Sequence, residues 1–180
     1  MQLGEDTITM SMTLNPVNEA AFQKAVQSLE TLNRAAVFHP TGTGKSCIAW
    51  KVVEAHPQTT FFWLVAGAQR LALRQAELTR YNGGTLPGNV RFCDCEKLAA
   101  ATPEQWVRLG EQKPGCIVLD CYHELSAVCW AQSVQKLLRM CPQAKVLGLG
   151  VPNGAPVCAA AQELFADCIV SHMTVAEAMA

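Results

Sequence analysis

Short runs of apolar residues alternate with segments of helical period along the chain. The run FFWLV at Phe61–Val65 is apolar at every position, which is typical of a central strand in a parallel sheet with both faces buried. The segments between the runs repeat apolar residues at three- and four-residue steps, which predicts helices. This alternation predicts a three-layer α/β/α fold with a mainly parallel sheet of about five or more strands. The predicted strands are Ala35–Phe38, Phe61–Val65, Val90–Cys93, Cys116–Asp120 and Lys145–Leu149, with a further short run at Cys168–Val170.

The predicted helices begin at residues that commonly start helices. Thr102 and Pro103 divide one helical segment in two, because Thr is a favoured N-cap and Pro fits the first helical position. The first helix follows Asn15-Pro16 for the same reason. The predicted helices are residues 17–32, Gly44–His56, Ala68–Tyr81, two within Glu96–Gln112, Val128–Met140, Val157–Phe165 and one that starts at Thr174.

The composition favours a single well-buried domain. Half of the 180 residues (50 %) are hydrophobic and 16 % are charged, against about 25 % charged in a typical domain. The high apolar content excludes intrinsic disorder, and no apolar run approaches the ~18 residues of a membrane span. We expect residues 1–180 to form one domain, in which residues 1–15 are flexible.

The charges and the cysteines limit the possible partners and the compartment. Fourteen basic and fifteen acidic residues give a net charge of −1, which excludes a protein that coats nucleic acid through bulk positive charge. The nine cysteines are an odd number without C-x-x-C spacing, and no signal peptide precedes them. We therefore expect a reduced, cytoplasmic protein in which these thiols act as small hydrophobic groups.

The strongest motif is HPTGTGKS, which lies between a predicted strand and a predicted helix. Glycines in such a loop allow successive N–H groups to point at phosphate oxygens, and the helix N-terminus adds positive potential. Lys45 would reach the phosphates and the Ser46 hydroxyl would bind Mg²⁺. The alternative is a Gly-rich turn with a surface lysine. The predicted nucleotide-binding residues of the loop are Pro40, Thr41, Gly42, Thr43, Gly44, Lys45 and Ser46.

His39 stands where the general phosphate-loop motif has its first glycine. We favour a role for His39 in closing the turn over a direct contact with nucleotide.

The variant PTGTGKS, without that first glycine, resembles motif I of superfamily 2 helicases and related type III restriction-type ATPases. The resemblance covers roughly residues 18–179 and includes three further landmarks. IVLDCYHELSA lies where that family has its Asp-Glu-x-His box, KVLGLGVPNGAP where it has Leu-Gly-Leu-Ser-Ala-Thr-Pro, and ELFADCIVSHMTVAEAM where its first RecA-like domain closes. The resemblance implies the first, ATP-binding domain of a DEAD/DEAH-box helicase, with ATP or ADP and Mg²⁺ as ligands.

The same resemblance assigns roles to residues outside the loop. Asp120 would hold Mg²⁺ together with Ser46, and His123 would couple the nucleotide to a neighbouring domain; the alternative for His123 is a helix-start residue. Asn18 lies where the family often has an adenine-reading Gln, although a surface position at the helix N-terminus is favoured. Arg70 and Arg74 lie in the DNA-backbone motif, where a solvated helix face is the favoured alternative.

Several departures from the family pattern predict impaired hydrolysis. Cys121 replaces the Glu that polarises the attacking water, and a thiol is a poor base for water. Glu124, three positions later, is a weak catalytic candidate. Gly150-Val151-Pro152 replaces Ser-Ala-Thr, so both coupling hydroxyls are lost. The 180 residues contain no second RecA-like domain, which in the family contributes an arginine finger.

We therefore expect a helicase-like domain that binds nucleotide and hydrolyses it slowly or not at all, without unwinding on its own. One alternative is a protein-interaction module with incidental nucleotide binding. Another is the N-terminal fragment of an active DNA or RNA helicase or translocase, with a second RecA-like domain as its partner. A small-molecule P-loop kinase fits the length, but the missing first glycine and the later landmarks disfavour it.

Overall fold

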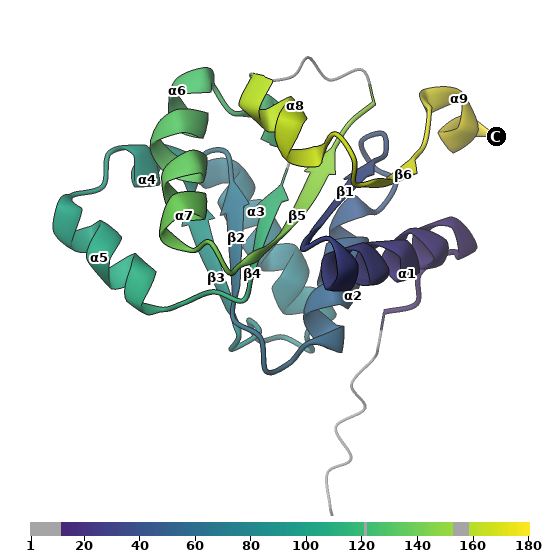
Figure 1. The fold of residues 1–180 in the computed structure, drawn as a ribbon. Coiled ribbons are helices and arrows are strands. Elements are labelled where there is room, and N and C mark those ends of the chain that lie inside the picture. The colour runs from purple at the N-terminus through teal and green to yellow at the C-terminus, as the bar shows by residue number, and fades with distance from the viewer. Residues whose placement is uncertain (1–11, 121, 153–158) are drawn as a thin grey trace, which may run out of the picture.

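The computed structural model describes residues 12–120, 122–152 and 159–180, and its elements can be followed in Figure 1. Six strands in this part form one sheet in which every pairing is parallel, in the order β3-β2-β4-β5-β1-β6. The predicted α/β architecture with a mainly parallel sheet is confirmed. The strands are β1 (Arg34–Phe38), β2 (Phe61–Val65), β3 (Val90–Asp94), β4 (Cys116–Asp120), β5 (Lys145–Gly150) and β6 (Ile169–His172).

Helices cover both faces of the sheet. They are α1 (Pro16–Thr31), α2 (Lys45–Ala55), α3 (Ala68–Tyr81), α4 (Cys95–Ala99), α5 (Pro103–Glu111), α6 (Ala127–Cys129), α7 (Gln135–Met140), α8 (Ala159–Phe165) and α9 (Val175–Met179), with a 3₁₀ turn η1 (Tyr122–Glu124) and a π turn η2 (Trp130–Val134). One hydrophobic core lies between the sheet and α1–α3, and a second lies between the sheet and α4, α5, η2, α7 and α8. The fold therefore has three layers.

The central strands follow the hydrophobic pattern. All five residues of β2 and all five of β4 are buried, as the uniform apolar run at Phe61–Val65 predicts. The helix starts are also as expected: Thr102 caps α5 in a reciprocal capping box with Gln105, and Thr174 caps α9 in the same way with Glu177. Local capping chemistry thus sets these two boundaries.

The helix predicted at Val128–Met140 is interrupted. It spans α6, η2 and α7, and η2 is a π turn. Inside this turn the buried Ser133 hydroxyl donates a hydrogen bond of 2.6 Å to the carbonyl of Cys95. Such a widened turn accommodates one residue more than an α-helical turn. The apolar residues of this segment repeat with nearly the same period as in a regular α-helix, so the sequence pattern does not reveal the π turn.

The described cysteines fit the interpretation of small hydrophobic groups. Five of them, Cys93, Cys95, Cys116, Cys141 and Cys168, are buried. Burial raises the pKa of the Cys93 thiol and of the Cys116 thiol to about 12, so both stay protonated at neutral pH. Cys121 and Cys158 lie outside the described residues. No helix in the described part of the chain has both the length and the apolar character needed to cross a membrane.

The approach of α8 to β5 gives a stability prediction. A Cβ added at Gly148 would lie 2.5 Å from Cζ of Phe165, whose buried ring packs on Tyr122 with the centroids 5.2 Å apart. We expect Gly148→Ala to lower the free energy of unfolding by about 1–3 kcal/mol through overpacking, as measured by urea denaturation. Gly88→Ala is the control, because a Cβ there has no atom within 4 Å. Equal stability of the two variants would contradict the packing described.

Candidate functional site: the loop between β1 and α2

The motif HPTGTGKS forms the connection from β1 to α2, at the edge of the sheet where the strands end. Gly42 has a φ of +84° and Gly44 a φ of +89°, the left-handed region that glycine adopts at little cost. Gly44 is the N-cap of α2 and provides no side-chain cap. The first N–H groups of this 11-residue helix therefore receive no hydrogen bond from an N-cap side chain, and helix N-termini of this kind can bind anions.

Lys45 is folded into this loop. Its side chain is buried, with 8 % of the residue exposed. The ammonium Nζ donates hydrogen bonds to the carbonyls of His39 at 2.7 Å and Pro40 at 2.8 Å. The surface position in the alternative interpretation of Lys45 is therefore wrong. Backbone carbonyls are weaker partners for an ammonium than phosphate oxygens are.

Asn18 connects α1 to the loop. Its Nδ2 donates a hydrogen bond of 2.8 Å to the carbonyl of Thr43, and the residue is 4 % exposed. The favoured surface position for Asn18 is therefore wrong: the N-cap side chain of Asn15 turns the start of α1 so that Asn18 faces inward. A Cβ at Gly44 would lie 2.8 Å from the Asn18 Nδ2, so this contact also requires glycine there.

His39 ties the loop to the edge of the sheet. The ring is fully buried, and its Nε2 lies 2.8 Å from the Ser171 hydroxyl of β6. The backbone N–H of His39 donates to the carbonyl of Gly150 at 3.2 Å. Burial, with the charges of Lys45 and His172, lowers the pKa of His39 to about 4, so the ring is neutral at pH values near 7. His39 therefore has a structural role between β5 and β6, and whether it also contacts a nucleotide stays a prediction.

Unpartnered polar atoms gather around the same loop. Among the described residues, Asn18 Oδ1, His39 Nδ1 and His123 Nδ1 are buried without a hydrogen-bond partner; Trp50 Nε1 and Trp130 Nε1 are the others. Buried polar groups are normally satisfied by protein, water or ligand. Three such atoms beside a glycine loop and a buried lysine fit a polar ligand that binds there. This donor and acceptor set suits the phosphates and polar groups of a nucleotide.

Asp120 ends β4 at the same edge of the sheet, and its side chain is 2 % exposed. Its Oδ2 accepts hydrogen bonds from Trp63 Nε1 at 3.0 Å and from Arg74 Nε at 2.6 Å. Since β5 lies between β4 and β1, Asp120 is two strands from the start of the loop, roughly 10 Å across the sheet. The structure thus brings Asp120 to the edge that carries Ser46, and a shared Mg²⁺ stays a prediction.

Arg74 differs from the solvated residue favoured by the sequence. Its side chain is 20 % exposed and pairs with both Asp120 and Glu77. These carboxylates outweigh the effect of burial and raise the pKa of Arg74. Arg70, one turn earlier, is more exposed and pairs with Glu124.

His123 and Glu124 lie on η1, directly beyond the end of β4. Burial is the largest cause that lowers the pKa of His123, and the positive charges of Lys45 and Arg70 act in the same direction. The influence of Lys45 links His123 to the loop. Glu124 is held by Arg70 of α3 and lies 3.6 Å from the His123 Nε2. Position 121, where the family has its catalytic Glu, lies outside the described residues.

Two contacts at this edge could not be predicted from the sequence. Trp63 reaches Asp120 from the neighbouring strand, and Ser171 reaches His39 from β6. Each contact joins two residues that are distant in the sequence, and each depends on the order of the strands in the sheet. In a purely apolar run such as β2, no pattern distinguishes a tryptophan that donates a hydrogen bond from one that only packs.

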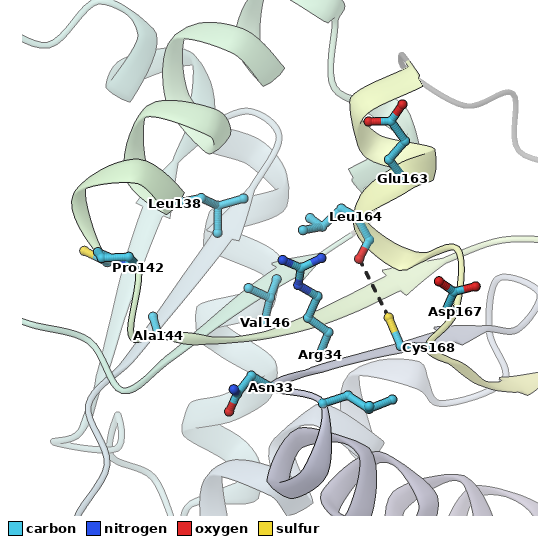
Figure 2. Close-up of a pocket in the computed structure, with 12 residues that line it drawn as sticks. Asn33, Arg34, Leu138, Pro142, Ala144, Val146, Glu163, Leu164, Asp167 and Cys168 are labelled. Carbon is cyan, nitrogen blue, oxygen red and sulfur yellow. Dashed lines mark hydrogen bonds between the residues drawn. The ribbon is translucent and has the colours of Figure 1, made fainter.

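A cavity of about 370 Å³ lies at the opposite end of the sheet and is separate from the loop. Its walls include Asn33 and Arg34 at the start of β1, and the side chain of Arg34 rises into it (Figure 2). A second hollow, of about 360 Å³, lies beside His123 and is lined by Phe38, Tyr122 and Phe165 among others. This aromatic hollow, unlike the first, adjoins the candidate site.

Comparison with known proteins identifies the fold. No protein-family model and no curated protein matches the chain. The crystal structure of T4 UvsW is similar with a TM-score of 0.62 and 11 % sequence identity, over 86 % of this chain and 33 % of that chain. The ATP-dependent Type ISP restriction-modification enzyme LlaBIII bound to DNA is similar with a TM-score of 0.63 and 13 % identity, over 93 % of this chain and 16 % of that chain. The chain spans a third or less of each of these two proteins and shares with them a RecA-like α/β fold.

The neutral His39 predicts a pH dependence of stability. The unfolded chain binds a proton at this residue below about pH 6.5, whereas the folded chain does so only near its pKa of about 4. Stability is therefore full above the higher value and is lost as the pH falls between the two. We expect His39 to contribute a loss of about 2 kcal/mol in unfolding free energy between about pH 7 and about pH 5.

Urea denaturation of the wild type and of His39→Gln at both pH values measures this contribution. His123 acts in the same direction and is present in both proteins, so the difference between them isolates His39. Identical pH slopes for the two proteins would contradict a buried, neutral His39.

Proposed function

We propose that this chain is a nucleotide-binding domain of the DEAD/DEAH-box helicase type, which binds ATP or ADP with Mg²⁺ and hydrolyses ATP slowly or not at all. The single observation that carries the proposal is the buried Lys45 ammonium, held on backbone carbonyls inside a glycine loop at the N-terminus of α2. A buried cation beside free helix N–H groups is the arrangement that binds phosphate most directly.

Each loop residue has a role in this proposal. The backbone N–H groups from Thr41 to Gly44 surround the β- and γ-phosphates, with Pro40 fixing the start of the turn. Lys45 moves its ammonium from the carbonyls of His39 and Pro40 to phosphate oxygens. When bound, Mg²⁺ neutralises charge between these phosphates. The Ser46 hydroxyl and the Asp120 carboxylate are the groups that would hold it.

Slow hydrolysis follows from the groups around Asp120. The residue after it is Cys121, and a thiol does not orient water as a carboxylate does. Glu124, the nearest alternative carboxylate in the sequence, is engaged by Arg70 of α3. His123 has a lowered pKa and is neutral, and its role in this proposal is to contact the nucleotide or a neighbouring domain rather than to act as the base.

A protein-interaction module is the second candidate, and the end of the described chain favours it. No residue of α9 is buried, and Val175 and Met179 are exposed together with Ile169 of β6. Apolar side chains gathered on an edge strand and the following helix are typical of a surface that a partner covers. The partner could be a second RecA-like domain or another protein. Nucleic acid enters only through the family resemblance, because the net charge is −1.

Nucleotide binding tests the first proposal. We expect a fluorescent ATP or ADP analogue to bind saturably, and Lys45→Ala to weaken binding by about tenfold or more, because a hydrogen bond to a charged group contributes about 1.5–3 kcal/mol. Lys51→Ala is the matched control: Lys51 lies on the same helix but pairs with Glu54 at 2.5 Å. Absence of Lys45-dependent binding at millimolar nucleotide would leave the interaction module as the better candidate.

Hydrolysis is tested separately by release of inorganic phosphate from ATP. We expect the wild-type rate to be no higher than that of Lys45→Ala, since Cys121 stands in place of the catalytic Glu and Gly150-Val151-Pro152 in place of Ser-Ala-Thr. Cys121→Glu restores only the first of these groups and should leave the rate low. Rapid turnover by the wild type that depends on Lys45 would refute the impaired chemistry and favour an active helicase.

A further inference from the structure

The Asp120 carboxylate is already neutralised by the protein. Both hydrogen bonds that it accepts from described residues fall on Oδ2, one from the neutral Trp63 indole and one from the Arg74 guanidinium. At 2.6 Å and with little solvent around it, the Arg74 contact is a charge-assisted hydrogen bond of the strong type. A carboxylate in this state has little charge left for a second cation.

Arg74 has a second partner, which remains in place if its contact with Asp120 breaks. Its Nη1 pairs with Glu77, three residues later on α3. The guanidinium can therefore give up Asp120 without becoming an unpaired charge, because Glu77 belongs to the same helix and moves with it. Breaking the contact between Arg74 and Asp120 is therefore less costly than breaking an isolated buried ion pair.

The position of α3 depends on these charges. Among the described residues of α3, only Leu78 is buried. The first half of the helix is connected to the end of β4 by the pair Arg74 with Asp120, and to the turn after it by the pair Arg70 with Glu124. A change in the partner of Asp120 therefore alters one of the contacts that position α3.

We propose that Arg74 competes with Mg²⁺ for Asp120, so that it sets how strongly nucleotide binding depends on Mg²⁺. The inference rests on the proposed nucleotide binding and concerns the same site. With Arg74 in place, Lys45 and the loop N–H groups bind the phosphates, and Mg²⁺ adds little to the affinity. When Arg74 is displaced from Asp120, the carboxylate regains its charge and the contribution of Mg²⁺ increases.

The direction of the effect follows from electrostatics, because a guanidinium in contact with the carboxylate offsets part of the charge that would attract Mg²⁺. We expect an effect on Mg²⁺ of about tenfold or more, the size of the contribution of one hydrogen bond to a charged group.

The experiment compares the dissociation constant of a fluorescent ADP analogue in EDTA with that in saturating Mg²⁺. For Arg74→Gln we expect the ratio of the two constants to exceed the wild-type ratio by about tenfold or more. Arg70→Gln is the matched control: it lies one turn earlier on α3, pairs with Glu124 rather than Asp120, and should keep the wild-type ratio. The measurement requires binding alone and no turnover.

The outcomes separate this inference from the proposed function. If the wild type and Arg74→Gln bind nucleotide with the same ratio, or if Arg70→Gln raises the ratio as much, the competition is refuted while nucleotide binding stands. If neither binds nucleotide in either condition, the proposed function fails and the inference fails with it. Circular dichroism verifies that Arg74→Gln is folded; if it is not, the uncharged Arg74→Met serves instead, and an unchanged ratio for it overturns the proposal.

Discussion

A buried ammonium organises the carboxyl edge of this sheet. Lys45 needs partners because an isolated charge is costly in the interior, and the carbonyls of His39 and Pro40 provide them. Its charge is one of the causes that lower the pKa of His39 and of His123, so that both rings stay neutral beside it. Burial is the larger cause of both pKa shifts, and the lysine at the start of α2 reinforces it at both imidazoles.

A second set of charges lies on the other side of the same edge. Asp120 and Glu124 face two arginines of α3, whereas the Lys45 ammonium donates to two backbone carbonyls. The edge is therefore divided between a buried lysine on one side and two carboxylate–arginine pairs on the other. In the function proposed above, an anionic ligand would bind at the first part, and Arg74 would compete with a metal ion at the second.

The sequence predicts the architecture well because local patterns decide it. The uniform apolar run of β2 requires burial on both faces, and the Thr102-Pro103 pair fixes the start of α5, so strands and helices fall close to their predicted bounds. The site is predicted only along the loop itself. The burial of Asn18 and the pairing of Arg74 depend on contacts with Thr43 and Asp120, which are 25 and 46 residues away. The periodicity of the sequence does not reveal such long-range contacts. The pattern of an amphipathic helix is the same whether Arg74 faces water or a carboxylate.

The position of β1 in the sheet has a consequence for how the chain is made. Both neighbours of β1, β5 and β6, come from the last third of the sequence. The loop residues leave the ribosome early, but β1 has no strand to pair with until β5, which ends at Gly150, has emerged. During synthesis β2, β3 and β4 can pair first, and β1 joins them through β5. The loop is therefore supported only once most of the domain has been made, and a ligand that bound it would stabilise only that late state.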